Sequence, residues 1–171
     1  GLSGLVAPKP NVQIITTSTD DIEIPAGSTR VYIEVIGGGG QGGAGAAATD
    51  KGSGGGGGGA FVRGIFDADA LPPLLDVIVG ATTGVFSTPD GANPAADGSG
   101  GNYSEVRNSS TGEVILKAYA GGGGAGGGQA AAGAYATGGG GGGTGGNGVS
   151  VTASATGGAG GDPDIQGSTQ G

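Results

Sequence analysis

The 171-residue chain contains no cysteine, histidine, methionine or tryptophan. Without cysteine and histidine there is no disulfide, no thiolate nucleophile, no imidazole acid–base catalyst and no zinc site built from the usual ligands. These absences exclude the chemistry of many enzyme active sites. We therefore expect a non-enzymatic protein without a cofactor, one that binds, assembles or spaces other molecules.

Cations and long apolar segments are also scarce. Six Lys and Arg residues stand against 14 Asp and Glu residues, which gives a net charge of −8. Six scattered cations cannot form the basic patch that nucleic-acid binding needs. The longest apolar runs, at residues 31–36 and 74–79, are far shorter than the roughly 20 residues of a membrane-spanning helix. We expect neither a nucleic-acid partner nor membrane insertion.

The carboxylates offer little further chemistry. Asp67, Asp69 and Asp76 lie around the prolines at positions 72 and 73, and we interpret them as solvated acids of a turn, because a catalytic pair needs a cleft that desolvates one partner. A calcium site at Asp67 and Asp69, or at Asp162 and Asp164, stays open as an alternative, although neither segment matches a known calcium loop. The prediction is that the chain holds no metal.

Glycine is what the chain has in abundance, with 48 residues beside 8 prolines. Glycine tracts alternate with segments in which apolar residues recur at every second position, the pattern of β-strands. Pro25-Ala26-Gly27 has the composition of a turn, so we predict a hairpin over residues 21–36. Two prolines shorten a helix-prone segment at 67–75 to a turn. The predicted strands are 12–16, 22–24, 31–36, 61–66, 74–79, 113–119 and 149–153.

The glycine tracts can be flexible linkers or ordered rods. We favour ordered rods, because the tracts stand between strands that must meet to bury apolar surface. Ordered polyglycine forms an extended helix with three residues per turn and a rise of about 3.1 Å, whose backbone groups bond sideways to neighbouring helices. The predicted fold class is all-β: a small antiparallel sheet or sandwich interleaved with ordered polyglycine tracts of polyproline II type, with almost no helix. The predicted divisions are an extended N-terminal arm at 1–11, a glycine-rich β domain at 12–161 and a C-terminal tail at 162–171.

The chain has only seven aromatic residues. We expect core packing for those in or beside strands, which are Phe61, Phe66, Phe86 and Tyr119. Tyr103 and Tyr135 have small and polar neighbours, which suits an exposed contact made by a rigid ring with a polar tip. The long, turn-rich segment 82–102 has the composition of a functional loop, and for that reason Phe86 is also kept as a contact candidate. The candidate receptor or partner contacts are Phe86, Asn93, Asn102, Tyr103 and Tyr135.

One segment carries a resemblance. Residues 24–43, IPAGSTRVYIEVIGGGGQGG, are similar to the opening of the glycine-rich domain of bacteriophage tail proteins and tail-fibre adhesins, in which a Pro-Ala-Gly turn and a strand lead into polyglycine. The pieces AFV at 60–62, LDVIVG at 75–80 and VILKAYAGGGGAGGG at 114–128 follow in the same order. The resemblance covers residues 20–160, and the sequence departs from it at the two prolines and in the loop 82–102.

The resemblance implies a non-enzymatic protein of the virion, located in a tail fibre or surface appendage. Some members of that group pack polyglycine helices into a sandwich whose connecting loops touch the bacterial receptor. The expected partners are copies of the same chain, with a trimer as the first expectation, or another virion fibre protein, and a bacterial surface receptor beyond them. The alternative is an ice-binding protein or a glycine-rich matrix or filament protein that uses flat polyglycine slabs as a regular surface.

Overall fold

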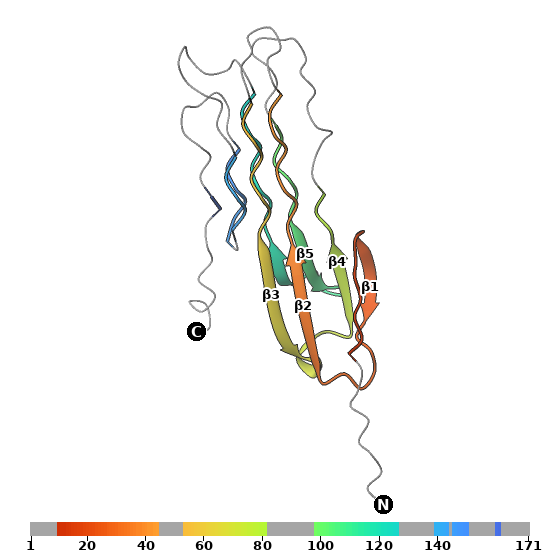
Figure 1. The fold of residues 1–171 in the computed structure, drawn as a ribbon. Coiled ribbons are helices and arrows are strands. Elements are labelled where there is room, and N and C mark those ends of the chain that lie inside the picture. Colours follow the sequence, from red (N-terminus) through yellow and green to blue (C-terminus); the bar gives the residue numbers. More distant parts are fainter. Residues whose placement is uncertain are drawn as a thin grey trace, which may run out of the picture.

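The computed structural model describes residues 10–44, 53–81, 98–126, 139–143, 145–150 and 160–161. Two antiparallel sheets face each other in it (Figure 1). One sheet has two strands and the other has four, in the order β1-β4-β5-β6. The all-β prediction is confirmed, and within the described ranges the only helical turn is a 3-10 turn at Ala68–Ala70. The strands are β1 (Thr19–Glu23), β2 (Arg30–Ile36), β3 (Phe61–Asp67), β4 (Leu74–Ile78), β5 (Ser104–Asn108) and β6 (Val114–Ala118).

The core lies between the two sheets. Alternation along β2 turns Val31, Ile33 and Val35 inward and leaves Tyr32 and Ile36 exposed, as the period of two requires. The buried cluster consists of Val35, Ala60, Val62, Leu75, Val106, Leu116 and Ala118. It contains no aromatic residue, so small and branched side chains form its centre.

The aromatic predictions had mixed outcomes. Phe66 packs against the core cluster, as expected, and Tyr119 is half-buried outside that cluster. The prediction for Phe61 was wrong, because its side chain is 53% exposed. Register explains the difference: Phe61 pairs with Ile36 on the outer side of the two-stranded sheet, while its neighbour Val62 faces the core. Phe86 lies outside the described residues.

The predicted hairpin over 21–36 was also wrong, although its turn exists. The Ser28 N–H donates to the Pro25 carbonyl at 3.1 Å, and Gly27 has a φ of +82°, a conformation that suits glycine. The turn carries the chain from one sheet to the other: β1 pairs with β4, and β2 pairs with β3. Placing consecutive strands in opposite layers lets both bury their apolar sides against the same core.

Three further segments differ from the prediction. Residues 12–16 form no strand, and Val12 and Ile14 are 76% and 86% exposed. Residues 149 and 150, the described part of the last predicted strand, are not in a sheet. β5 was missed, because Ser104, Glu105 and Arg107 hide its alternation; Ser104 and Glu105 are nevertheless buried.

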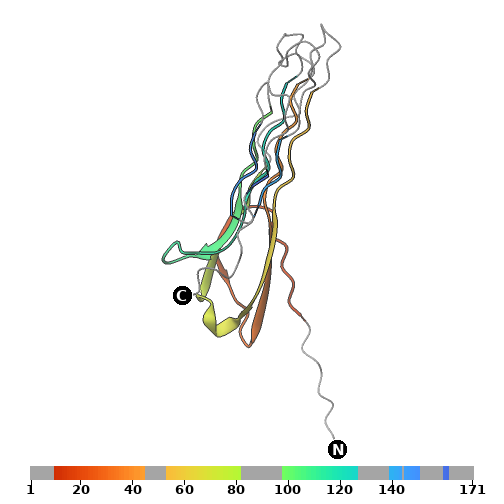
Figure 2. The ribbon, with the colours of Figure 1, turned by 90° about the vertical axis from the view of Figure 1, so that its left-hand side faces the viewer.

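Glycine tracts extend from one end of the sandwich and lie side by side in both views (Figures 1 and 2). β2 leads into the first tract, the second tract leads into β3, the third leads into β5 and β6 leads into the fourth. The prediction of ordered tracts is confirmed over their described parts. We number the tracts along the chain as tract 1 (37–44), tract 2 (54–60), tract 3 (98–102), tract 4 (119–126), tract 5 (139–143) and tract 6 (145–150).

Candidate functional site

The tracts form a bundle, which we call the rod, and its hydrogen bonds repeat every three residues. Three amides of tract 1 donate to three carbonyls of tract 2: Gly37 to Ala60, Gly40 to Gly57 and Gly43 to Gly54, at 2.8–2.9 Å. Tract 2 is joined to tract 4 in the same way: Ala60 to Tyr119, Gly57 to Gly122 and Gly54 to Ala125, at 2.8–2.9 Å. Three residues per turn is the period of a polyproline II helix, so each tract offers every third group to the same neighbour.

Tract 4 is the central member of the rod. The Gly121 N–H donates to Gly38 of tract 1, the Gly122 N–H to Gly140 of tract 5, and the Gly123 N–H to the Ser150 hydroxyl of tract 6. Tract 4 carbonyls accept amides of tracts 2, 3 and 6. All residues from 120 to 126 are buried. Successive residues point in different directions, so one chain segment is bonded to five others.

Glycine is required in this tract by close approach. A Cβ atom built on Gly121, Gly122, Gly123 or Gly124 would lie closer than 3.0 Å to a backbone atom of a neighbouring tract. Ala120 and Ala125, in contrast, are each 1% exposed and are accommodated. Each position of the tract therefore has its own steric requirement, and a methyl group is tolerated only where the neighbouring backbones leave room.

A charged cluster lies at the junction of the sandwich and the rod. The Lys117 ammonium is 3.2 Å from the Glu105 carboxylate, whose side chain is only 6% exposed. The same ammonium lies 3.5 Å from the centre of the Tyr103 ring and 5.2 Å from that of Tyr119. Two rings and one carboxylate thus share one cation, an arrangement that compensates the burial of Glu105.

A second ion pair crosses the four-stranded sheet. The Arg107 guanidinium donates to Asp76 Oδ2 at 3.3 Å from two nitrogens, and the Asp21 N–H donates to Asp76 Oδ1 at 3.2 Å. The Asp21 amide, with smaller contributions from Ser109 and Arg107, lowers the pKa of Asp76 below its ordinary value of 3.8, against the effect of desolvation. The interpretation of Asp76 as a solvated turn acid was wrong, because it lies within β4 and is 6% exposed.

Two of the five candidate contact residues fall within the described residues. Asn102 belongs to tract 3, where its carbonyl accepts the Gly38 N–H at 2.9 Å and its own N–H donates to Ala81 at 3.1 Å, while its side chain is exposed. Tyr103 is the residue before β5 and is 37% exposed. Phe86, Asn93 and Tyr135 lie outside the described residues. The contact role of all five stays a prediction.

Sequence reasoning missed the partners of Tyr103. Lys117 and Glu105 face each other because β5 and β6 pair in register at these positions. The only available signal was the alternation of charged and apolar residues at 105–107, which places Glu105 and Arg107 on the side of the strand opposite to Val106. Once β5 is recognised, pairing across the turn at 109–113 follows.

The first alternative calcium pair, Asp67 and Asp69, lies on the surface. Asp67 and Asp69 line an open depression with Ser28 and Thr29, and Asp67 also pairs with Arg30 at 3.6 Å. No group of three acidic side chains able to hold a metal occurs in the described part of the chain, and no helix there is long and apolar enough to span a bilayer. The alternative calcium pair, Asp162 and Asp164, lies beyond these residues.

A family model described as a glycine-rich domain matches residues 15–171, which includes both sheets and every tract of the rod. No curated protein and no solved structure is significantly similar to the chain.

Proposed function

This chain belongs to the glycine-rich domain family, and from that premise we propose that it is a non-enzymatic structural protein of a bacteriophage virion. In this proposal it is a component of a tail fibre or surface appendage, assembles with itself or with a fibre partner, and contacts the host surface. Family membership itself says only that the domain is glycine-rich. The link to a phage tail comes from the resemblance of residues 24–43.

The observation that carries the proposal is the rod. Its tracts are joined through backbone groups, and tract 4 is buried along 120–126. An eight-residue polyglycine helix is about 25 Å long, so the rod holds its far end well away from the sandwich without a large apolar core. A stiff, thin spacer of this kind suits an appendage that must present a surface at a distance.

The far end of the rod is where we propose contact with the host. Gly43 bonds to Gly54 there, and Gly98 bonds to Gly124. In the sequence, residues 45–52 and 127–138 follow tracts 1 and 4 at this end, and residues 82–97 precede tract 3 there. These segments contain three of the candidate contact residues: Phe86, Asn93 and Tyr135. In the proposal these segments meet the receptor, and the sandwich faces the particle.

The experiment that tests the virion role is direct. Particles are purified from a culture in which the gene is expressed, the chain is sought in them by mass spectrometry, and an antibody against the domain is located by electron microscopy. We expect the chain in the particle, with the antibody on a fibre or surface appendage. Absence of the chain from purified particles would end the proposal.

A competition assay tests the contact with the host. Purified chain added to host cells should reduce adsorption of the phage in a dose-dependent way. A matched control is the chain with Tyr135 and Phe86 both changed to Ala, since these positions lie outside the described sandwich and rod. Equal competition by the two proteins would remove these two residues from the proposed contact surface.

A further inference from the structure

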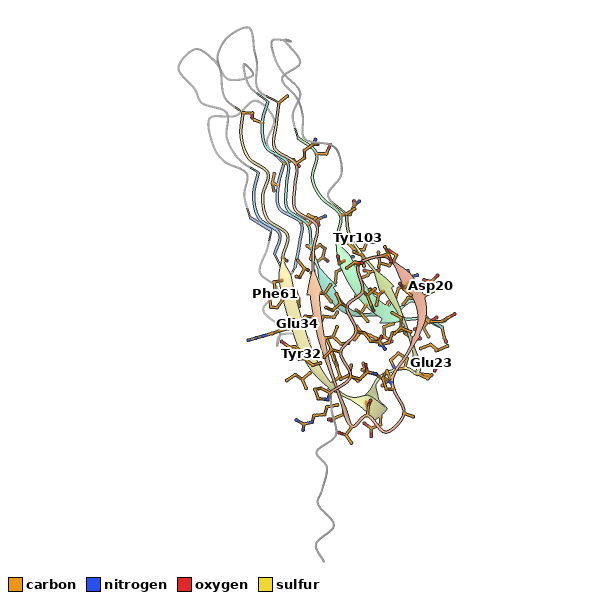
Figure 3. All side chains as sticks on the ribbon, turned by 45° about the vertical axis from the view of Figure 1, so that its right-hand side comes forward. Asp20, Glu23, Tyr32, Glu34, Phe61 and Tyr103 are labelled. Atoms are coloured by element: carbon orange, nitrogen blue, oxygen red, sulfur yellow. The ribbon has the colours of Figure 1, made fainter. Side chains whose placement is uncertain are left out.

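The two-stranded sheet has an uncovered outer face, which we call the β2–β3 outer face. Alternation puts every second residue of both strands on it: Arg30, Tyr32, Glu34, Ile36, Phe61, Arg63, Ile65 and Asp67. Its four apolar members are unusually exposed, at 53% for Tyr32, 65% for Ile36, 53% for Phe61 and 67% for Ile65. Figure 3 shows Tyr32, Glu34 and Phe61 along this side of the sandwich. Exposed apolar side chains gathered on one face mark an interaction surface.

The strand register orders this face into four levels. Arg30 pairs with Asp67, Tyr32 with Ile65, Glu34 with Arg63, and Ile36 with Phe61. Charged and apolar levels therefore alternate, and each charged level has one cation and one anion on opposite strands.

This pattern is complementary to itself under one rotation. A two-fold axis parallel to the strands, lying on the face, places β2 of one copy over β3 of the other at the same level. Arg30 then meets Asp67 of the second copy, Glu34 meets Arg63, and each apolar level meets an apolar level. When the two faces overlap over all four levels, a two-fold axis across the strands instead sets the charged end level against the apolar end level, which costs desolvation without pairing. The charge pattern selects the first arrangement.

The rod extends the same side of the molecule. Tracts 1 and 2 continue β2 and β3, and on tract 2 a Cβ built on Gly55 or Gly58 would meet no atom within 4 Å. Within the described residues, the amides of these two glycines have no hydrogen-bond partner. Two strands alone are small beside the roughly 800 Å² per partner of a stable interface. Tract 2 lengthens the uncovered side, since Gly55, Gly56 and Gly58 are exposed along it, and its open amides are suited to bond a further polyglycine tract.

We propose that the β2–β3 outer face binds a second copy of this chain, with the two strand pairs face to face about a two-fold axis parallel to the strands and the two rods side by side. A patch that contacts its own copy closes a two-fold pair, so this face makes a dimer and not the trimer that the resemblance led us to expect. The proposal does not depend on a role in the virion.

Charge exchange between two variants tests the pairing. In the Glu34→Arg variant, the new arginine would face Arg63 of a second copy. In the Arg63→Glu variant, Glu34 would face the new glutamate of a second copy. Either variant alone should self-associate roughly tenfold or more weakly than the natural chain. Mixed together, the two variants restore every opposite-charge contact across the interface and should form a one-to-one heterodimer. Sedimentation equilibrium of each protein and of the mixture measures these outcomes.

Two controls separate association from folding. Glu113→Arg makes the same change of charge at an exposed position in the turn between β5 and β6, and it should leave the dimer intact. Ile65→Ala removes an exposed apolar side chain outside the core cluster, so it should weaken association while circular dichroism and the melting temperature of the monomer stay unchanged. This second variant keeps the test valid if a charge change across the strands disturbs the sheet.

Several results would overturn the proposal. A natural chain that stays monomeric at every concentration up to its solubility limit would overturn it. The face would then be covered by the chain's own N-terminal residues or by another fibre protein. A trimer that persists in both charge variants would assign association to a different surface. Failure of the folded variants to associate when mixed would refute the two-fold pairing.

Discussion

Two adjacent glycines of tract 2 give the sharpest test of the packing argument. The Gly57 N–H donates to Gly122 and its carbonyl accepts from Gly40, both at 2.8 Å, and a Cβ at this position would lie closer than 3.0 Å to the Gly140 carbonyl. Gly58 is the next residue in the same tract, yet a Cβ there would meet nothing within 4 Å. Gly57→Ala and Gly58→Ala thus make the same chemical change in two different environments.

The expected effects have opposite signs. In Gly57→Ala the methyl group must push tract 5 away, which adds an overpacking cost of about 1–3 kcal/mol and about 1–3 kcal/mol for a buried hydrogen bond that is lost. Together these terms should lower the free energy of unfolding by about 2–6 kcal/mol, a decrease in melting temperature on the order of 10 °C for a domain of this size. Gly58→Ala restricts the unfolded chain and should stabilise the fold by about 0.4–1 kcal/mol.

Differential scanning calorimetry of the two variants at one protein concentration measures both effects. A large decrease for Gly57→Ala beside a small increase for Gly58→Ala supports the bundle of close-packed tracts. Equal shifts in the two variants would refute it, because a flexible or loosely packed tract cannot distinguish neighbouring glycines.

Four further predictions concern the sandwich and the alternative function. The pKa of Asp76 is lowered in the folded state, so the ionised carboxylate stabilises the fold above the ordinary pKa of 3.8, and this contribution is lost as the pH falls through the lower folded-state pKa. Asp76→Asn should therefore be less stable at neutral pH. Denaturant unfolding at several pH values should show that this variant loses less stability in acid than the natural chain does. Lys117→Ala leaves the buried Glu105 carboxylate without its cation, and urea unfolding should show a loss of about 1–3 kcal/mol; an unchanged stability would mean that the cluster is not formed. Leu116→Ala opens a cavity in the core cluster and should cost about 2–5 kcal/mol in the same assay. No Thr occurs in the described parts of the six tracts, so we expect no thermal hysteresis from the purified chain, and a clear hysteresis gap would favour ice binding instead.

Local patterns in the sequence predicted much of the sandwich. The alternation at 31–36 and 61–66 corresponds to β2 and β3, and glycine tracts were expected to be ordered beside them. Strand pairing was not local: a Pro-Ala-Gly turn fits a hairpin and a crossing between layers equally well, and only the complete core decides between the two. β5 was hidden because Glu105 is buried by pairing with Lys117, a contact that requires knowledge of the neighbouring strand.

The candidate site was predicted only in part. Tyr103 stood out because large side chains are rare in its surroundings, yet nothing at 102–104 indicated the ammonium that lies over its ring. Tract 3 was interpreted as the end of a loop, because Asn102 and Ser99 interrupt its glycines. In the rod both positions are exposed, so a polyglycine helix can contain other residues where no neighbouring backbone approaches.

The central claim is that backbone hydrogen bonds between glycine tracts hold the rod together, and amide hydrogen exchange of the ¹⁵N-labelled chain, followed by nuclear magnetic resonance, tests it most directly. The amides of Gly121, Gly122 and Gly124 donate to other tracts and belong to the buried centre, so we predict that they exchange orders of magnitude more slowly than those of Gly55 and Gly58. Uniformly fast exchange at all five glycines, at the rate of an unstructured peptide, would contradict the account.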